Sequence, residues 1–376
     1  MSVSSSRADT PIRAAVLGYG LAGRVFHCPF VSAVPGLELT AIVQRTGSEA
    51  ALAYPEARIL RSADEAFADP SIDLIVVATP NETHFDLASR ALQAGKHVVV
   101  DKPITSSAES ARQLAALARA GKRILAPFHN RRWDGDFLTL RKLLLDSTLG
   151  RVVEIVSRFD RYRPLQRPNT WKESANASTG VHFDLGPHLV DQALALFGPP
   201  ARLAASLRYD RDRTDIDDAF DLILYYDMPY GRALRYACHA TLLAADPSPR
   251  FLVNGTHGTW RKFGVDPQEP TLLTTTRRPP RLESPESAAE PWLTEPESAW
   301  GTLTLARELS QSPELTQAPL PTIPGDYRLF YANVRDAILG RTPLAVSAED
   351  GYRTLRLLDL ARESHRQRRT LPVTWD

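Results

Sequence analysis

The sequence predicts two domains: a doubly wound parallel α/β domain over residues 1–127 and an α+β domain with a largely antiparallel, open sheet over residues 128–376. Up to Pro127, short apolar runs alternate with segments of helical character, and a glycine-rich turn follows the first run. Later apolar runs succeed one another without helices between them. Alternating strands and helices are typical of a parallel sheet, whereas consecutive strands favour antiparallel pairing. The length of 376 residues also suits two domains.

The first domain is expected to hold five strands with helices between them. Its apolar runs are rich in β-branched residues, as suits strands buried on both faces of a parallel sheet. Ser62 and Ser106 each precede a glutamate by three residues, which is the capping-box pattern of a helix start. A further helix is predicted over residues 82–94, just before Gly95. The predicted strands are residues 12–17, 37–43, 58–60, 74–78 and 97–100.

The second domain is predicted to begin with a helix over residues 135–145 and to close with two more, over residues 326–339 and 347–366. Residues 267–324 are rich in Pro, Ser, Thr and Glu and show little periodicity. They are therefore expected to form a long surface excursion. The predicted strands are residues 152–159, 203–208, 220–226, 232–240 and 251–254.

The composition argues against several classes of function. Lys and Arg number 45 and Asp and Glu number 44, so bulk charge favours neither nucleic acid nor an anionic membrane as a partner. Cys28 and Cys238 are too few for a disulfide framework and are expected to be buried thiols. Neither cysteines nor histidines show the spacing of a zinc motif, so no metal is expected. No apolar run reaches the roughly 18 residues that span a bilayer. Residues 1–10 lack the apolar core of a secretory signal, so a cytoplasmic location is expected.

Residues 18–23 form the pattern GxGxxG directly after the first predicted strand and at the start of a predicted helix. This is the setting of a Rossmann dinucleotide site. Gly18 is expected to permit the tight turn, Gly20 to let the backbone approach a pyrophosphate, and Gly23 to let the helix pack closely on the strand. Leu21 and Ala22 would place their backbone N–H groups at the helix N-terminus, where phosphates bind.

The end of the second predicted strand bears on which nicotinamide cofactor is used. NAD sites usually place a carboxylate here to bind the ribose 2′-hydroxyl. This chain has Arg45 and Thr46 instead, while Glu38 lies mid-strand and Glu49 comes later. Because a guanidinium suits the 2′-phosphate of NADP, NADP(H) is favoured. NAD(H) stays open, since Arg45 could also be a solvated surface charge.

Two further motifs follow predicted strands at the carboxyl edge of the sheet, where open α/β sheets bind ligands. Thr79-Pro80-Asn81 follows the fourth strand and Asp101-Lys102-Pro103 the fifth. The position of Lys102 after an apolar strand and before a proline indicates a catalytic role instead of the usual solvated one. The Lys102–Pro103 bond is compatible with the cis form, which proline makes less costly. The cofactor-binding candidates are Gly18, Gly20, Leu21, Ala22, Gly23, Arg45, Thr46, Thr79, Pro80, Asn81, His84, Asp101 and Lys102.

The densest polar cluster of the second domain is Gly180–Gln192, in which Asp184 and His188 are four residues apart and would share a helix face. Pro187 fits only a first helical turn, so the helix should begin close to Asp184. Hydride transfer from an alcohol needs a proton acceptor and a positive charge that stabilises alkoxide character. His188 is the candidate general acid/base and Lys102 the candidate polarising donor. Asp184 would bind a hydroxyl or tune the other two. These roles require Lys102 and His188 to reach one substrate oxygen.

Three signatures of the chain together resemble the Gfo/Idh/MocA family of oxidoreductases: residues 18–23, the Asp-Lys-Pro motif at 101–103, and Asp184 with His188. The resemblance implies that the family's catalytic lysine, aspartate and histidine correspond to Lys102, Asp184 and His188. The family's two-domain fold agrees with the division predicted above. Position 101 departs mildly, because Glu is commoner than Asp there in the family.

Within the family, residues 128–139, 161–164 and 263–269 resemble the NADP-dependent scyllo-inositol dehydrogenase branch. The branch implies an NADP(H)-dependent dehydrogenase acting on a cyclic polyol, most simply scyllo-inositol or a related inositol. A sugar dehydrogenase or reductase and a non-catalytic NADP sensor are the alternatives, and a sensor has no need of Lys102 and His188. Family members usually pair through the open face of the second sheet, so a homodimer or homotetramer is expected. The substrate-binding candidates are His129, Asn130, Tyr162, Arg163, Asp184 and His188, although the run at 130–133 could instead be structural.

Overall fold

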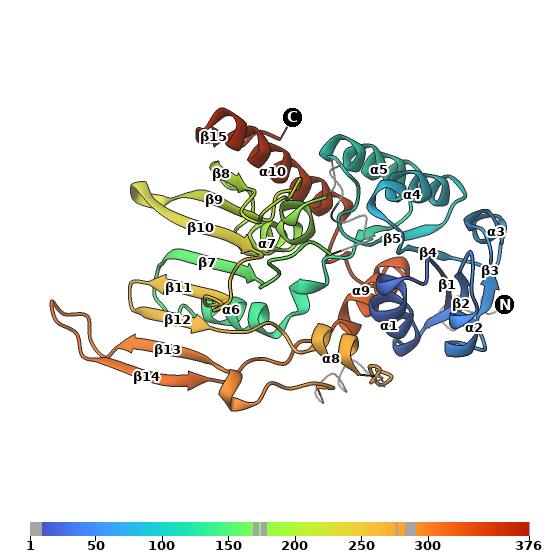
Figure 1. The fold of residues 1–376 in the computed structure, drawn as a ribbon. Coiled ribbons are helices and arrows are strands. Elements are labelled where there is room, and N and C mark those ends of the chain that lie inside the picture. The colour runs from blue at the N-terminus through green and yellow to red at the C-terminus, as the bar shows by residue number, and fades with distance from the viewer. Residues whose placement is uncertain (1–9, 168–172, 174–178, 276, 283–290, 376) are drawn as a thin grey trace, which may run out of the picture. The chain divides into compact units, whose positions relative to one another are not determined.

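The computed structural model divides the chain into two compact units, each assembled from three stretches of sequence (Figure 1). The model describes residues 10–167, 173, 179–275, 277–282 and 291–375. The first unit comprises Met1–Asn130, Gln268–Trp292 and Asp326–Tyr352, and the second comprises Arg131–Pro267, Leu293–Gly325 and Arg353–Asp376. The chain first passes from one unit to the other between Asn130 and Arg131, which is close to the predicted boundary at residue 127. The sequence pattern does not reveal that two later stretches belong to the first unit.

The sheet of the first unit has six parallel strands in the order β3-β2-β1-β4-β5-β6. All five predicted strands are present. β6 was not predicted, because it has only three residues and ends in a proline. The order reverses between β1 and β4, which is where doubly wound sheets bind dinucleotides. The strands are β1 (Ile12–Leu17), β2 (Leu37–Val43), β3 (Arg58–Leu60), β4 (Leu74–Val77), β5 (His97–Val100) and β6 (Leu125–Pro127).

Two of the helices in the first unit test the predicted capping boxes. The box at Ser62 is confirmed, with reciprocal bonds between Ser62 and Glu65. The box at Ser106 is wrong: the next helix begins one residue later, so Ser107 Oγ accepts from the Ser110 N–H at 3.2 Å. The helices are α1 (Cys28–Ala33), α2 (Glu49–Ala53), α3 (Ala63–Ala68), α4 (His84–Gln93), α5 (Ala108–Ala120), α8 (Gln268–Thr274) and α9 (Arg328–Ile338).

The two returning stretches complete the core of the first unit around α1. The Phe30 ring packs edge-on against Tyr327 at 5.8 Å and against Trp292 at 6.2 Å between ring centroids. The backbone N–H of Leu282 donates to the carbonyl of Ala33 at 2.8 Å. The described part of the predicted surface excursion is therefore partly docked, because its apolar residues are buried against α1.

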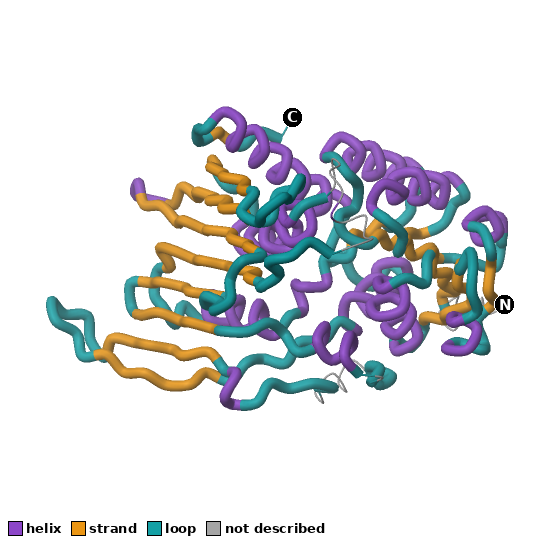
Figure 2. Tube along the Cα trace, viewed as in Figure 1, coloured by secondary structure: helices purple, strands orange, loops and turns teal. Residues whose placement is uncertain are grey.

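The second unit is built on a nine-stranded sheet in the order β14-β13-β12-β11-β7-β10-β9-β8-β15 (Figure 2). Only the β7–β10 pair is parallel, so the largely antiparallel sheet is confirmed. β13 and β14 lie inside residues 267–324, so the expectation of an irregular excursion is wrong there. The strands are β7 (Val152–Asp160), β8 (Arg202–Arg208), β9 (Ala219–Met228), β10 (Arg232–Thr241), β11 (Phe251–Gly255), β12 (Gly258–Lys262), β13 (Gly301–Ala306), β14 (Leu315–Leu320) and β15 (Leu371–Pro372).

Three longer helices complete the second unit: α6 (Gly135–Leu145), α7 (Val181–Phe197) and most of α10 (Ala348–Gln367). α7 begins at Val181 and carries Pro187 in its interior, so the prediction that Pro187 marks the first turn is wrong. Proline normally clashes with the Cβ of the residue before it. That residue is Gly186, which has no Cβ, and this relieves one obstacle to a helical proline. A Cβ at Gly186 would also lie only 2.9 Å from Leu358 Cδ2.

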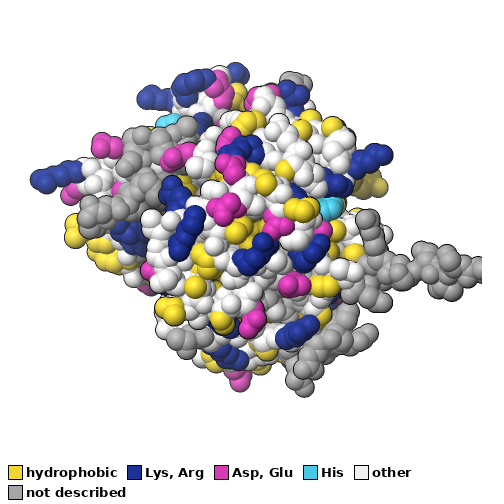
Figure 3. All heavy atoms as spheres, turned by 90° about the vertical axis from the view of Figure 1, so that its right-hand side faces the viewer, with side chains coloured by type: hydrophobic (Ala, Val, Ile, Leu, Met, Phe, Trp, Pro, Cys, Tyr) yellow, Lys and Arg dark blue, Asp and Glu magenta, His cyan; other side chains and the backbone are white. Residues whose placement is uncertain are grey.

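Basic and acidic side chains are interspersed on the molecular face in Figure 3 and form no single charged patch. This agrees with the near-zero net charge of the chain. Among the residues that the model describes, no helix combines the length and apolar character needed to cross a membrane. Cys28 and Cys238 are both buried thiols, as predicted.

Candidate active site

The glycine-rich turn after β1 has the geometry that its three glycines predict. Gly18 has a φ of 101°, and a Cβ there would lie 2.6 Å from the carbonyl oxygen of Ala78. A Cβ at Gly23 would collide with the carbonyl oxygen of Gly18. A Cβ at Gly20 would meet no heavy atom within 4 Å. The turn is therefore tight at Gly18 and Gly23, and its backbone is open to a ligand at Gly20.

The helix after this turn begins beside it, with first-turn backbone N–H groups that have no acceptor within the helix. The first helical hydrogen bond runs from the Arg24 N–H to the carbonyl of Gly20 at 3.0 Å. Donors in a first turn lack intrahelical acceptors, and such donors suit phosphate oxygens. The helix widens into a π-turn over Gly23–His27, directly before Pro29 near the start of α1. Pro29 cannot donate to an earlier carbonyl, which favours an irregular turn at this point.

The loop after β2 exposes Arg45 and Thr46 and is braced by an arginine that the sequence analysis missed. Arg61 Nη1 donates to the carbonyls of Gln44 and Gly47, each at 2.9 Å. Glu49 is engaged by the side-chain amide of Gln44. The loop that would bind the cofactor's ribose is thus held from its base, with the Arg45 side chain at the surface. The sequence did contain a signal for Arg61, because this residue directly follows β3 at the edge of the sheet where ligands bind.

His84 joins two loops at the carboxyl edge of the sheet from inside the protein. Its Nε2 lies 2.9 Å from the carbonyl of Thr79, and its Nδ1 lies 2.8 Å from the carbonyl of Pro103. Burial lowers the pKa of His84, while Asp101 and the two carbonyls oppose that shift. His84 is fully buried with both nitrogens engaged, so it supports these loops and is not placed to touch a cofactor directly. The Lys102–Pro103 bond is cis, as the sequence allowed.

Asp101 occupies a partly buried position between Lys102 and His27. Its Oδ1 accepts from the Lys102 backbone N–H at 2.7 Å, and its Oδ2 lies 4.0 Å from His27 Nε2. Burial raises the pKa of Asp101, but the nearby His27 and the Lys102 charge outweigh it and hold the pKa at about 2. At 4.0 Å the contact with His27 is electrostatic and not a formed hydrogen bond. Tyr331 lies on the other side of the imidazole, with its hydroxyl 2.6 Å from His27 Nδ1.

In the second unit, Asp184 and His188 are brought together on α7, as their spacing predicts. Asp184 Oδ2 lies 3.6 Å from Arg161 Nη1, and the Asp184 side chain is 28% exposed. His188 is 6% exposed, and its ring packs edge-on against Phe159. One carboxylate with a partly accessible oxygen therefore stands one turn before a largely buried imidazole.

The first turn of α7 is fixed by a carboxylate from the segment before β9. Asp217 Oδ2 accepts from the His182 N–H at 2.6 Å, and the Asp217 carbonyl accepts from the Val181 N–H at 2.8 Å. Gly180, at a φ of 89°, leaves no room for a Cβ beside that carboxylate. Burial raises the pKa of Asp217 to about 6. This cap determines where the Asp184 turn begins.

His182 has a structural position. Its ring is fully buried, its Nε2 lies 3.1 Å from the carbonyl of Leu358, and burial lowers its pKa to about 3. Within the described ranges, no group of three His, Cys, Asp or Glu side chains is arranged to hold a metal ion.

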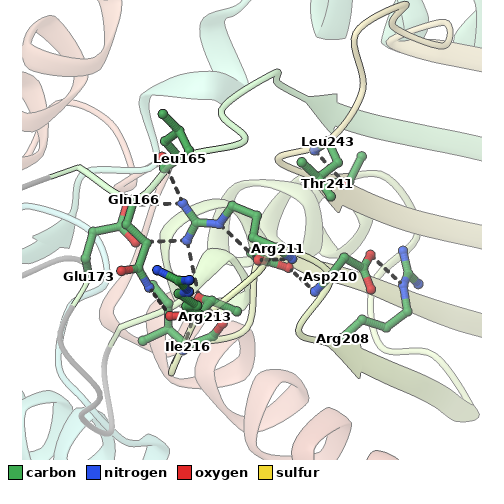
Figure 4. Close-up of polar contacts among 12 residues, drawn as sticks. Leu165, Gln166, Glu173, Arg208, Asp210, Arg211, Arg213, Ile216, Thr241 and Leu243 are labelled. Carbon is green, nitrogen blue, oxygen red and sulfur yellow. Dashed lines mark hydrogen bonds and ion pairs between the residues drawn. The ribbon is translucent and has the colours of Figure 1, made fainter.

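The segment that carries Tyr162 and Arg163 follows β7 and is anchored by a buried arginine, Arg211 (Figure 4). Arg211 Nε binds Asp218 Oδ2 at 3.0 Å, and its Nη2 binds Glu173 Oε2 at 2.8 Å. A third donor of the same guanidinium reaches the carbonyl of Leu165 at 3.4 Å. The Tyr162 side chain is 60% exposed, and the Arg163 N–H is tied to the carbonyl of Leu242 at 2.7 Å. Arg211 therefore positions the segment. No local sequence motif predicted this role.

The remaining substrate candidates divide between the units. His129 and Asn130 are buried in the first unit. In the second unit, Arg132 binds Asp191 through two hydrogen bonds of 2.9 and 2.6 Å, and Arg131 pairs with Asp134 at 3.0 Å. The two arginines therefore serve the packing of the second unit. Lys102 and the cofactor candidates belong to the first unit, and Tyr162, Arg163, Asp184 and His188 to the second.

Parts of both units match the same family of known proteins. Residues 12–129 match the model of an oxidoreductase family with an NAD-binding Rossmann fold, and residues 141–374 match the C-terminal alpha/beta domain of the same family. The uncharacterized oxidoreductase YdgJ of Escherichia coli is 40% identical over 96% of this chain and 98% of its own. The scyllo-inositol 2-dehydrogenase (NADP(+)) IolW of Bacillus subtilis is 32% identical over 97% of this chain and 96% of its own. A solved oxidoreductase from Yersinia pestis superposes with a TM-score of 0.86 at 40% identity, covering 98% and 99% of the two chains.

Proposed function

The chain belongs to the Gfo/Idh/MocA family of oxidoreductases, and on that premise we propose that it is an NADP(H)-dependent dehydrogenase of a cyclic polyol, with scyllo-inositol or a related inositol as the first candidate. The reaction would interconvert a secondary alcohol and its ketone. The observation that carries this proposal is the pair of Asp184 and His188 on one face of α7, in a chain whose Lys102 follows the partly buried carboxylate of Asp101. The names of two relatives, IolW and the inositol 2-dehydrogenase of Rhizobium meliloti, support the substrate class.

The first unit fits a nicotinamide dinucleotide. The open space at Gly20 and the first-turn amides suit a pyrophosphate. The exposed Arg45, on a loop braced by Arg61, suits the 2′-phosphate that distinguishes NADP from NAD. Thr79, Pro80 and Asn81 would line the adjoining edge. When bound, the cofactor supplies the hydride acceptor or donor.

The residues of the chain would divide the proton chemistry among them. His188 would take the hydroxyl proton during oxidation, and we assign this to Nε2 because Nδ1 is buried. The Lys102 ammonium would stabilise negative charge on the same oxygen. The partly exposed carboxylate of Asp184 would accept a hydrogen bond from a neighbouring hydroxyl of the polyol. Tyr162, Arg163, His129 and Asn130 remain candidates for the other hydroxyls, because buried hydroxyls must be paired.

A sugar dehydrogenase is the second candidate. The D-glucoside 3-dehydrogenase of Escherichia coli is 27% identical over 53% of this chain. A panel of inositols, aldoses and glycosides, each tested with NADP and NAD by absorbance of the reduced nicotinamide, separates the two candidates. Turnover of inositols with NADP supports the proposal, and turnover of glycosides alone would replace it.

The same panel tests the assigned residues. Lys102→Ala and His188→Ala should each lower kcat by about 10²- to 10⁴-fold while NADPH binding survives. Lys142→Ala, which removes an exposed lysine on α6, is the matched control and should turn over normally. Unchanged turnover in either variant would remove that residue from the mechanism.

We also propose that the chain forms a homodimer or homotetramer through the outer face of the second sheet. Along β9, buried residues alternate with half-buried ones, among them Asp221, Ile223 and Tyr225. A sheet covered on one face leaves the other face available to a partner. Sedimentation of Ile223→Arg tests this proposal: a smaller assembly is expected, and an unchanged mass would refute it.

A further inference from the structure

In the first unit, Lys102, Asp101, His27 and Tyr331 form a series in which each residue lies next to the following one. Asp101 precedes Lys102 after β5, His27 lies in the π-turn before α1, and Tyr331 lies on α9. His27 and Tyr331 are fully buried. The proposed hydride transfer needs neither His27 nor Tyr331. Because burying polar groups is costly unless they are paired, their presence beside the candidate lysine calls for an explanation.

The Tyr331 hydroxyl fixes the protonation pattern of His27. Burial raises the pKa of Tyr331 well above its ordinary value, so the hydroxyl keeps its proton. Within the described part of the chain, its hydrogen-bond partner is His27 Nδ1, at 2.6 Å. The hydroxyl therefore donates and Nδ1 accepts. In a neutral imidazole the remaining proton then resides on Nε2.

That Nε2–H is directed toward Asp101. His27 Nε2 is buried, the residues that the structure describes offer it no hydrogen bond, and Asp101 Oδ2 lies 4.0 Å away. A movement of less than about 1 Å would form a hydrogen bond to the carboxylate. The other titratable groups that act on this pair are Lys102, His84 on α4 and Tyr331 on α9, and Cys28 at the start of α1 acts on Tyr331. Of these, Lys102 and His84 favour the charged form of Asp101, as does His27 itself.

We propose that His27 and Tyr331 are positioning residues for Lys102. Tyr331 orients the imidazole, the imidazole N–H holds Asp101 as a carboxylate, and Asp101 holds both the backbone and the charge of Lys102. The inference rests on the proposed function in one respect only, namely that Lys102 is the residue being positioned. Such a series, buried at His27 and Tyr331, keeps the ammonium beside a carboxylate anion over the whole working pH range.

His27→Phe tests the inference while keeping an aromatic ring against Phe128, which lies 4.6 Å from the imidazole between centroids. The Asp101 carboxyl should then titrate at least one pH unit above its pKa of about 2. The readout is the carboxyl ¹³C chemical shift, assigned by difference from Asp101→Asn. His27→Gln retains an N–H donor and should restore much of the low value. Equal titration of Asp101 in the parent protein and in His27→Phe would overturn the proposal.

Tyr331→Phe removes a single oxygen and should shift the Asp101 titration in the same direction by a smaller amount. In the His27→Phe background the same change should have no further effect, because Tyr331 acts through His27. Additive shifts would contradict the series. Tyr226→Phe is the matched control, because it removes a buried hydroxyl of the second unit to which the described residues offer no hydrogen bond.

Turnover supplies the second readout. In His27→Phe, the acid-side inflection of kcat/KM that depends on the Asp101 carboxyl should move upward with the carboxyl titration, by at least one pH unit relative to the parent protein. NADPH binding at pH 8 should be unchanged. If no polyol or sugar is turned over, the proposed function fails, whereas the carboxyl titration still decides the inference.

Discussion

Replacing Gly20 by alanine should separate cofactor binding from folding. Gly20 is not among the residues with positive φ, and an added Cβ meets no heavy atom within 4 Å. Where alanine adopts the native backbone without strain, a Gly→Ala change stabilises a protein by about 0.4–1 kcal/mol, chiefly by restricting the unfolded chain. The free energy of unfolding of Gly20→Ala should therefore stay level or rise by that amount.

Cofactor affinity should fall in the same variant. The new methyl group would occupy the space through which the pyrophosphate approaches the first-turn amides, so at least one charge-assisted hydrogen bond would be lost or lengthened. Such a bond contributes about 1.5–3 kcal/mol, which corresponds to a Kd roughly 10 to 100 times weaker. Titration with NADPH, followed by nicotinamide fluorescence, measures the Kd. Urea unfolding of the unliganded protein measures the stability.

Gly23→Ala provides the contrast, because its Cβ would collide with the carbonyl oxygen of Gly18. Two backbone segments would have to separate, and the free energy of unfolding should fall by about 1–3 kcal/mol or more. An unchanged Kd for NADPH in Gly20→Ala would show that the cofactor does not approach this turn. A large loss of stability in Gly20→Ala would refute the argument from open space.

Three further changes test other parts of the structure. Arg45→Asp should lower kcat/KM with NADP relative to NAD by about 10- to 100-fold, as measured in parallel assays, and unchanged selectivity would remove Arg45 from the site. His182 has its pKa lowered to about 3, so the fold favours its neutral form. The stability that depends on His182 is therefore present above pH 6.5 and is lost on acidification toward pH 3, by about 1.4 kcal/mol per pH unit. His182→Gln should flatten this slope in urea unfolding between pH 7 and pH 5. Arg211→Met should cost about 3–5 kcal/mol of stability because two carboxylates lose their buried partner, whereas Arg112→Met, which removes an exposed ion pair, should change little.

The parts of the fold that were predicted correctly have strong local signals. The strands of the first unit are short runs of β-branched residues bounded by polar turns, and the bounds of β1, β2 and β3 agree with the prediction. The glycine roles were also predictable, because each follows from the absence of a Cβ at one position of a known turn. Asp184 and His188 share a face of α7 because helical periodicity fixes residues four apart.

The parts that were missed lack a local signal. β14 is almost entirely exposed, so it shows no alternation between apolar and polar residues. β15 pairs two residues with β8, which are distant in sequence. Pro187 was misjudged because the usual rule omits the freedom that Gly186 gives. At the site, His27 and Tyr331 are 304 residues apart, and Arg211 acts through partners on other segments. Such contacts depend on the tertiary fold.

The discontinuous make-up of the first unit has a consequence for biosynthesis. The ribosome completes the first 130 residues long before residues 326–352 emerge. In the folded protein, however, Tyr327 of that later stretch packs on Phe30 and Tyr331 contacts His27. A nascent N-terminal module therefore carries an uncovered aromatic surface until translation is almost finished, and such surfaces promote aggregation and chaperone capture. A fragment that ends near residue 130 would retain this exposed surface permanently.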